Sequence, residues 1–370
     1  MNKKFQITYP ISGVDYRKID PLKILAQKAA QKTAKNISDT GFKELPQSRG
    51  ESAYVIDCNQ FYLASITECL GTKALVADEM RKITGKTYYD DIAQDTIAMA
   101  VNDIVAVGAK PISVHAYWAA GSSEWFDDEK RIRDLVNGWK KACNLSEVSW
   151  GGGETPALTG VVEKNAIDLA ASCVGIIKPK SRLTLGDKLK SGDVIVVFAS
   201  SGIHANGLTL ARKIAEKLPK GYATKINGKS MYGEALLKPT TIYTKLIDKL
   251  FKNKIDIHYM VNITGHGWLK IMRHPNKFTY RITKLPPVPD VLKFIVEKAN
   301  LEHKDAYSSL NMGAGFAIFI PEKDVKKTLS ISKKTGINAY VIGLVEKGTK
   351  QVIIEPLKII YEGKVFKLRK

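Results

Sequence analysis

The chain has 370 residues, of which 44% are hydrophobic, and its 57 basic and 37 acidic residues give a formal net charge of +20. This length accommodates two domains, and no apolar run approaches the ~18 residues that a membrane span needs. Because the basic residues are spread from Lys3 to Lys370 without a dense basic run, we expect neither nucleic acid nor a membrane as partner.

The four cysteines give no sign of a metal site or a disulfide framework. None of them forms a Cys-x-x-Cys pair: Cys58, Cys69, Cys143 and Cys173. The start of the chain also lacks the apolar stretch of a signal peptide. We therefore expect a cytoplasmic protein with reduced thiols.

The predicted elements indicate an α/β protein whose first half mixes strands and helices less regularly than its second half. In the first half we expect helices at 21–32, 95–109 and 127–143, with strand-like segments at 53–67, 111–118 and 169–177. The polar, turn-rich segment Lys178–Gly186 is the best candidate for a domain boundary. Beyond it we expect strands at 194–199, 315–320 and 339–345, and helices at 208–217 and 290–299.

The helix predicted over Asp95–Ala109 is apolar nearly all round, and Gly108 supplies a residue that can end it. Residues seven apart differ by about 20° around a helix, so Asp95 and Asn102 share a face and Asp103 lies at its edge. Buried carboxylates are costly unless something compensates their charge. A divalent cation between carboxylates and phosphate oxygens would do so, and so would paired Lys or Arg residues or exposure to water.

Five glycine-containing segments could bind a ligand, because glycine allows close backbone approach. Thr67–Lys73 offers carboxylate, hydroxyl and lysine groups suited to a metal-bound triphosphate but lacks Walker A spacing, and Gly151–Thr155 is a predicted glycine turn that presents Glu154. At Ser200–Gly207 a strand-to-helix turn carries His204 and Asn206, where backbone N–H groups favour an anion. The remaining two are 264–267 and 311–315. Each segment also fits an ordinary structural turn.

Taken in order, these segments resemble the AIR synthetase (phosphoribosylformylglycinamidine cyclo-ligase) family of the PurM-like superfamily. The family's Thr-Asp-Gly-Val-Gly-Thr-Lys motif is matched by Thr67–Lys73, and its Asp-Leu-Val-Ala-Met-Cys-Val-Asn-Asp-Leu helix by Asp95–Ile104. The other matches are Gly152–Thr155, Ser200–Gly207, Lys238–Tyr243, Ile263–Gly267 and Asn311–Gly315.

The resemblance implies a PurM-like fold with an N-terminal ATP-binding and dimerisation domain at 1–178 and a C-terminal domain at 179–370. It further implies a homodimer that uses ATP and Mg²⁺ on a small phosphoribosyl substrate. The expected reaction is ATP-dependent closure of the imidazole ring of formylglycinamidine ribonucleotide, which gives aminoimidazole ribonucleotide in purine biosynthesis.

The resemblance also assigns candidate site residues by their place in the matched motifs. Catalytic roles fall to Lys73, Asp95 and His204, and Mg²⁺ binding to Glu68, Asp95, Asp103 and Glu154. The candidates for nucleotide binding are Thr67, Gly71, Thr72, Lys73, Asn102, Gly152, Gly153 and Thr155. Those for substrate binding are His204, Asn206, Gly207, Thr264 and Gly265.

Three departures from the family pattern indicate a divergent member. The family's glycine-rich segment before the first strand is replaced by Arg49–Tyr54, its Asp-Gly becomes Glu68-Cys69, and the third residue of its Thr-Gly-Gly-Gly turn is His266. Two alternatives therefore stay open. One is an ATP-dependent enzyme of this superfamily acting on another small amide or phosphate acceptor, and the other is a non-catalytic nucleotide-binding paralogue.

Overall fold

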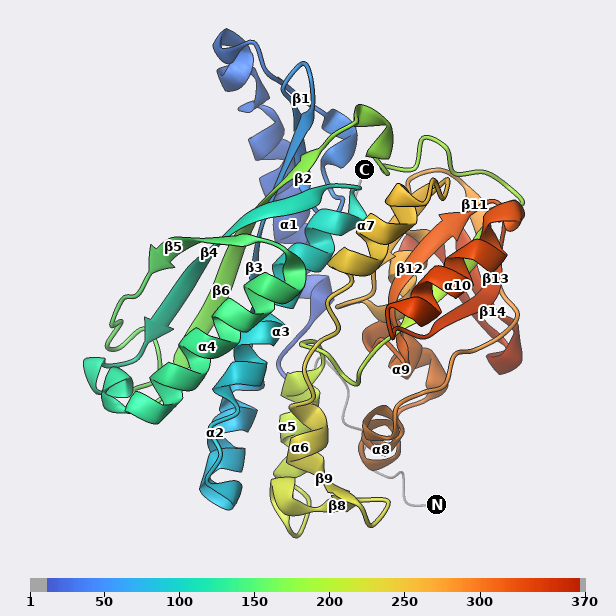
Figure 1. Ribbon diagram of the computed structural model, residues 1–370. Coiled ribbons are helices and arrows are strands. Elements are labelled where there is room, and N and C mark those ends of the chain that lie inside the picture. The colour runs from blue at the N-terminus through green and yellow to red at the C-terminus, as the bar shows by residue number, and fades with distance from the viewer. Residues whose placement is uncertain (1–11, 367–370) are drawn as a thin grey trace.

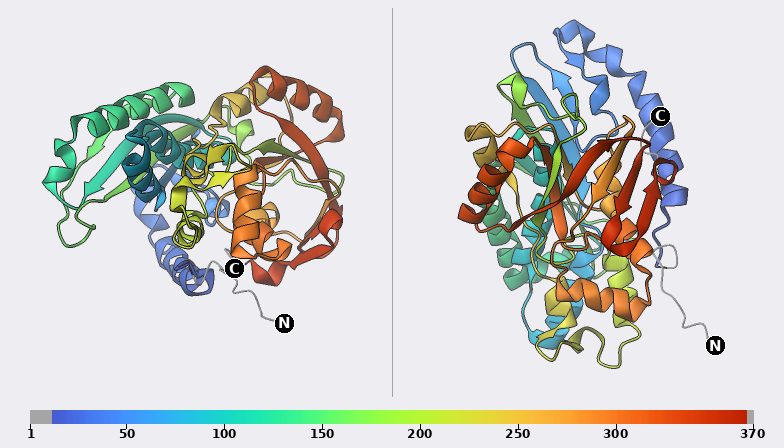
Figure 2. Two further views of the ribbon diagram at one scale, coloured as in Figure 1. Left: turned by 90° about the horizontal axis from the view of Figure 1, so that it is seen from below. Right: turned by 90° about the vertical axis from the view of Figure 1, so that its right-hand side faces the viewer.

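The computed structural model describes residues 12–366, and in it two β-sheets lie on either side of the central helix α3 (Figure 1). Seen from below, the N-terminal and C-terminal halves of the chain lie side by side (Figure 2). The polypeptide passes from one sheet to the other through the predicted boundary segment Lys178–Gly186. The division into domains at this segment stays a prediction.

The first sheet, called the N-terminal sheet below, has the strand order β1-β2-β3-β6-β4-β5 within the described residues. Its strands are β1 (Lys43–Glu44), β2 (Tyr54–Asp57), β3 (Tyr62–Cys69), β4 (Lys110–Ala120), β5 (Ser149–Glu154) and β6 (Ile167–Ile177). Helices α3 and α4 pack on one face of this sheet. In β6 every second residue is buried, so its two faces differ as they do in a half-covered antiparallel sheet.

The second sheet, the C-terminal sheet, has the order β10-β12-β7-β13-β11-β14-β15 in the part of the chain that the structure describes. Its strands are β7 (Val194–Ala199), β10 (Tyr259–Asn262), β11 (Phe278–Ile282), β12 (Ala314–Ile320), β13 (Ala339–Lys347), β14 (Gln351–Ile354) and β15 (Ile359–Glu362). A separate small hairpin is formed by β8 (Lys225–Ile226) and β9 (Ser230–Met231). The interior strand β7 carries the polar segment Ser200–Gly207 at its end, and Asn206 of that segment contacts Met99 of α3.

The helices pack against the two sheets and fill the space between them. They are α1 (Tyr16–Gln31), α2 (Lys73–Thr84), α3 (Tyr89–Ala106), α4 (Glu129–Ser146), α5 (Leu208–Ala215), α6 (Tyr232–Leu236), α7 (Thr244–Lys252), α8 (Asp290–Ala299), α9 (His303–Ser309) and α10 (Val325–Lys334). Helix α7 packs with α10 over the apolar side chains of β7, β10 and β12. No helix among the described residues is long and apolar enough to cross a membrane.

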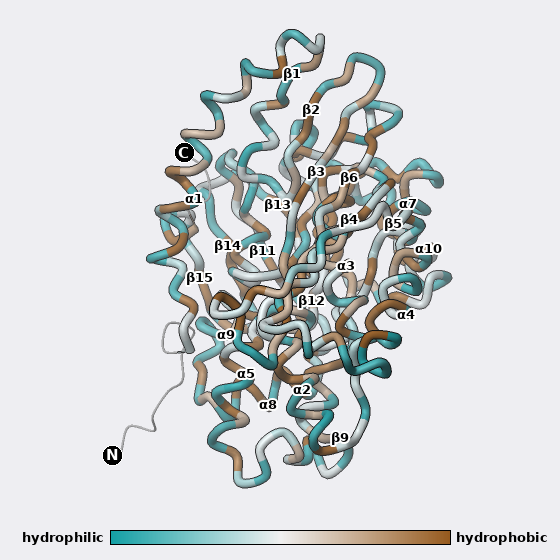
Figure 3. Tube along the Cα trace, turned by 90° about the vertical axis from the view of Figure 1, so that its left-hand side faces the viewer, coloured by the Kyte–Doolittle hydropathy of each residue, from teal (hydrophilic) through white to brown (hydrophobic). Residues whose placement is uncertain are grey.

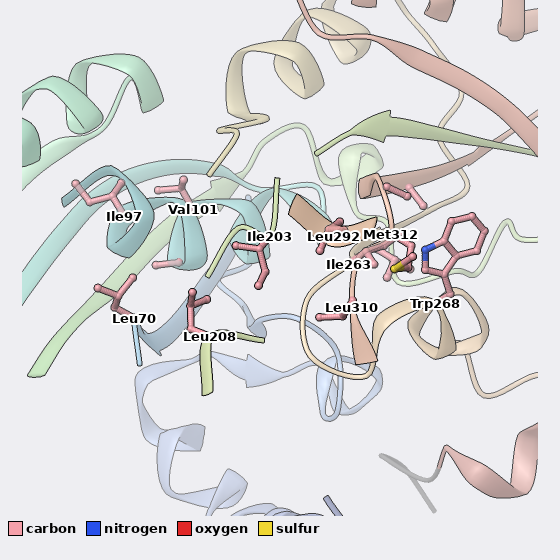
Figure 4. Close-up of a cluster of buried hydrophobic side chains, with 14 of the residues drawn as sticks. Leu70, Ile97, Val101, Ile203, Leu208, Ile263, Trp268, Leu292, Leu310 and Met312 are labelled. Atoms are coloured by element: carbon pink, nitrogen blue, oxygen red, sulfur yellow. The ribbon is translucent and has the colours of Figure 1, made fainter. Parts of the chain in front are cut away.

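One hydrophobic core joins the two halves. Ile97 and Val101 of α3 lie at one end of it, Ile203 and Leu208 lie in the middle, and the cluster continues to Trp268 in the C-terminal half (Figure 4). Because tightly packed side chains resist displacement, this shared core holds the ends of α3 in a fixed position relative to both sheets.

Helix α1 starts five residues before its predicted start at Pro21, because the Asp15 side chain caps it by accepting a hydrogen bond from the Arg17 N–H at 3.0 Å. Hydrophobic and hydrophilic residues alternate along it (Figure 3). Leu22 and Leu25 are 67% and 64% exposed, so much of its apolar surface faces solvent in the single chain.

The central helix α3 starts at Tyr89, six residues before its predicted start, and two further segments differ from their predictions in kind. The strand-like stretch 53–67 is an antiparallel pair, β2 and β3, with a turn in which Asn59 has φ +67°. The predicted turn Gly151–Thr155 lies mostly within strand β5, which pairs in parallel with β4. Gly153 has to be glycine there, because a Cβ atom would lie 2.2 Å from the Ala116 carbonyl oxygen. In contrast, the predictions for 194–199 and 290–299 are confirmed to the residue.

Candidate functional site

Lys73 and Asp95, both predicted to be catalytic, form an ion pair of 2.8 Å whose side chains are completely inaccessible to solvent. The Lys73 ammonium also donates to the carbonyl oxygens of His204 and Lys238, each at 3.0 Å, so its three hydrogens all have protein acceptors. The other Asp95 oxygen accepts from the backbone N–H and the hydroxyl of Thr240. In this arrangement both residues have protein partners, and the predicted phosphate contact of Lys73 and metal contact of Asp95 stay predictions.

Asp95 and Asn102 do share one face of α3 as predicted, and both form hydrogen bonds with the 240–243 segment of the same chain. Asn102 accepts a hydrogen bond from the Tyr243 N–H at 3.0 Å and donates one to the Thr241 carbonyl at 2.9 Å. Both α3 residues therefore hold the Lys238–Tyr243 segment. The Asn102 amide is thus paired with protein through its oxygen and its nitrogen, and its predicted ligand contact stays a prediction.

His204 is buried inside its own turn with φ +61°. Its Nε2 accepts the Ser201 N–H at 3.1 Å, and burial together with the nearby Lys73 charge lowers the pKa of His204 to about 3. The imidazole is therefore neutral and held inside its turn in this conformation, and its predicted catalytic and substrate-binding roles stay predictions.

Other predicted residues do come together, at a place we call the central site: Glu68, Asp103, Asn206, Thr264, Gly265 and, not predicted, Lys270. Asp103 accepts a hydrogen bond from the Asn262 amide at 2.7 Å, at the end of β10. The turn that follows is half-buried, and a Cβ atom on Gly265 would lie 3.5 Å from the Asn206 side-chain oxygen. Asn206 in turn contacts Met99, one helical turn before Asp103 on α3. Gly207, the last residue of the Ser200–Gly207 segment, stands at the start of α5 with φ +93°.

The electrostatics of the central site combine two carboxylates with the buried Lys270 and two further cations. Burial and the Asp103 charge raise the pKa of Glu68 to about 7, and the charges of Lys270, Arg273 and Lys23 oppose this rise. Burial lowers the pKa of Lys270 to about 8, with the charge of Asp103 opposing the change most strongly. Lys270 was not among the predicted site residues. The pattern that indicates it is a single charged residue within the apolar segment Gly267–Met272.

Glu154, Gly152, Gly153 and Thr155 lie elsewhere, at the exposed edge strand β5 and just beyond it. The strand register aligns Glu68 with Ala171, Ala116 and Gly153 across three strand spacings, roughly 14 Å. Glu154 pairs with Tyr117, which points away from α3, whereas Glu68 lies on the α3 side. The four predicted metal ligands therefore do not converge within one chain, and no cluster of three or more His, Cys, Asp or Glu side chains suited to a metal occurs in residues 12–366.

The residues between Glu68 and α2 keep open space for a ligand. Gly71 has φ +73° with no atom within 4 Å of the place that a Cβ atom would occupy, whereas the predicted nucleotide ligand Thr67 precedes Glu68 and is exposed on the other face of β3. The Thr72 hydroxyl is buried and has no hydrogen-bond partner in the described part of the chain. An unpaired buried hydroxyl at a helix N-terminus fits an acceptor supplied by a ligand.

Two of the departures from the family pattern fasten the N-terminal segment to the C-terminal half. The His266 ring stacks on Tyr16 of α1 at 3.7 Å and its Nε2 contacts Asp20 at 3.1 Å. Within the 49–54 segment, Glu51 accepts hydrogen bonds from the Tyr259 hydroxyl, and Arg273 donates to the Gly50 carbonyl at 2.9 Å. The segment that replaces the glycine-rich loop is therefore tied down next to the central site.

Comparison with known proteins agrees with this architecture. Residues 50–177 match the model of the AIR synthase related protein N-terminal domain, and residues 190–355 that of its C-terminal domain. A phosphoribosylformylglycinamidine cyclo-ligase of Methanocaldococcus jannaschii is 36% identical over 344 residues, which cover 92% of each chain. The chain belongs to this cyclo-ligase family.

Solved structures show the same fold at lower identity. The structure titled AaThiL complexed with AMPPCP and TMP has a TM-score of 0.57 at 16% identity, over 85% of this chain and 90% of that one. T. maritima PurL complexed with FGAR gives 0.57 at 14% identity, over 85% of this chain and 47% of that one. This cyclo-ligase family member therefore has the two-part PurM-like fold that its motifs imply.

Proposed function

We propose that this protein closes the imidazole ring of formylglycinamidine ribonucleotide at the expense of ATP. The observation that carries the proposal is the 36% identity to the Methanocaldococcus jannaschii cyclo-ligase over 92% of both chains. In this reaction the formyl oxygen of the substrate accepts the γ-phosphoryl group of ATP. This step releases ADP. The amidine nitrogen then attacks the formyl carbon, and the bond from that carbon to the phosphorylated oxygen breaks, so that phosphate leaves and the ring closes.

The central site supports this proposal through its chemistry. Asn206 and the Thr264–Gly265 turn offer amide and backbone groups that can orient a polar substrate, and a positioned reactant needs little further activation to form a ring. The unpaired Thr72 hydroxyl and the open Gly71 backbone, which follow Glu68 along the chain, are suited to phosphate oxygens. Lys73, Asp95 and His204 serve as the framework that fixes these loops.

Glu68 and Asp103 fit a divalent cation. Within residues 12–366 neither carboxylate has an ion-pair partner within 4.0 Å, although Glu68 is half-buried and Asp103 is 6% exposed. Carboxylate oxygens are the ligands that Mg²⁺ prefers, and these two residues would hold it. Bound Mg²⁺ would supply charge neutralisation for the phosphoryl oxygens of ATP.

A homodimer is the second part of the proposal, and the face of the N-terminal sheet opposite α3 supports it. Ile112 on this face is 44% exposed, and Thr67 and Cys69 are exposed on it two strands away, on β3. A second copy that covered the face would remove this apolar area from water, and Glu154 would then lie at the interface. Light scattering should return about twice the 40.9 kDa of one chain at micromolar concentration; a single-chain mass would refute the dimer.

An assay of ADP release with and without formylglycinamidine ribonucleotide tests the activity. Substrate-dependent ADP release together with an aminoimidazole product is the expected result. Release of ADP only with a different amide or phosphate acceptor would replace the substrate but keep the ATP chemistry. Binding of ATP without turnover on any acceptor would make the chain a nucleotide-binding paralogue.

A further inference from the structure

Lys270 is a buried lysine that forms no ion pair within 4.0 Å in the described part of the chain. It lies in the 3₁₀ segment Gly267–Met272, only 8% of its surface is exposed, and its ammonium donates to the Thr264 hydroxyl. An ammonium has three hydrogens, so one protein acceptor leaves two for other acceptors. This contrasts with Lys73, whose hydrogens all have acceptors in the interior.

The charged groups around Lys270 leave its ammonium without an ion-pair partner in the described residues. Asp103 and Glu68 are the carboxylates that act on it, yet neither forms an ion pair with it within 4.0 Å in the described residues. Two other cations act on it. Arg273 is held by the Gly50 carbonyl, the Ser52 hydroxyl and the Glu51 carboxylate, and the exposed Lys23 pairs with Asp20 at 3.4 Å. Lys270 is therefore the cation of the central site that remains available.

The balance of charge among Glu68, Asp103 and Lys270 favours binding of an anion at the central site. If Glu68 and Asp103 hold a divalent cation, their two negative charges are compensated, and the ammonium of Lys270 is left in excess beneath the half-buried Thr264–Gly265 turn. A buried, uncompensated cation is unfavourable until an anion joins it. Phosphoryl oxygens that share the divalent cation would provide that anion.

We propose that Lys270, and not Lys73, is the lysine that contacts the phosphoryl oxygens of the bound nucleotide, an inference that rests on the proposed ATP-dependent function. Thr264 is the positioning residue that holds its ammonium toward the central site. Lys270 thus adds affinity for the polyphosphate part of the ligand and none for its nucleoside part.

The test compares Lys270→Met with the wild type by calorimetric titration with a non-hydrolysable ATP analogue and with AMP, both in the presence of Mg²⁺. We expect the affinity for the ATP analogue to fall by about 10- to 100-fold, as for the loss of a hydrogen bond to a charged group, and that for AMP to change by less than about threefold. Lys284→Met removes an exposed lysine after β11 and is the matched control, with no change for either ligand.

Thr264→Val provides a second variant that keeps the Lys270 charge but removes its hydrogen-bond acceptor. This variant should lower the affinity for the ATP analogue by a smaller factor than Lys270→Met does. Equal losses for the analogue and AMP, or no loss in a folded Lys270→Met protein, would overturn the proposal. Failure of the wild type to bind ATP at all would instead contradict the proposed function, so the two failures are distinguishable.

Discussion

Helix α3 carries two buried aspartates, eight residues apart, that the protein treats in opposite ways. Asp95 is paired with Lys73 and receives two hydrogen bonds from Thr240, whereas Asp103 receives one from Asn262 and has no ion pair within 4.0 Å among the described residues. A compensated carboxylate stabilises a particular packing of its neighbours, while an uncompensated one stores a cost that a ligand can relieve. The same residue type on one helix thus forms framework at one position and a candidate site at the other.

The largest effect should come from breaking the compensated pair. Lys73→Met leaves the Asp95 charge in a fully buried position without its partner, so we expect the free energy of unfolding to fall by about 3–5 kcal/mol. Denaturant titration measures this change. Adding Asp95→Asn to Lys73→Met should recover much of the loss, and a single variant as stable as the wild type would show that the pair is not structural.

Asp103→Asn tests the uncompensated position. The change keeps the shape and the pairing with Asn262 but removes the charge, so Mg·ATP binding or turnover should fall by two orders of magnitude or more, roughly 3 kcal/mol. Thermal stability without ligand should stay the same or rise, because an uncompensated carboxylate is costly to bury. Melting curves recorded beside rate measurements separate the outcomes; a destabilised variant with full activity would remove Asp103 from the site.

A third α3 carboxylate, Asp91, extends the comparison to pH. Burial first, then the charges of Asp90 and Asp95, raise the pKa of Asp91 to about 6, from 3.8 for the unperturbed group. Below pH 3.8 both states of the protein hold the proton, and as pH rises through about 6 the folded state loses stability relative to the unfolded chain.

Asp91→Asn should therefore be more stable than the wild type by about 1–2 kcal/mol at pH 7.5 and equally stable near pH 4. Melting curves across this range check the direction. A difference that does not change with pH would contradict the raised pKa of Asp91.

The smallest effect is expected at Glu68, the partner of Asp103. Glu68→Asp shortens the arm by one methylene but keeps the charge, so we expect folding to be intact and the Mg²⁺ concentration needed for half-maximal turnover to shift several-fold, about 1 kcal/mol. A magnesium titration that superimposes on that of the wild type would exclude Glu68 as a metal ligand.

The fold and the central site were predictable to different extents. The motif order indicated the family and the two-part fold, and periodicity located α3, β7 and α8, because local patterns determine whether a segment is helix or strand. The motifs assigned Glu68 and Asp103 to a metal, and Asn206 and the Thr264–Gly265 turn to the substrate, and these assignments stay predictions. The motifs could not predict the place of Glu154, because only the strand register shows that Glu154 and Glu68 lie on opposite faces of the sheet.

By itself, the sequence determined that Asp95 and Asn102 share one face of a buried helix, since that follows from 3.6 residues per turn. It could not determine what each polar residue faces. Lys73 meets carbonyl groups 131 and 165 residues away, and Asn262 lies 159 residues from Asp103. Such partners depend on how distant segments pack, so only the tertiary structure decided that the motif lysine is buried framework and that Lys270, which belongs to none of the quoted motifs, stands at the site.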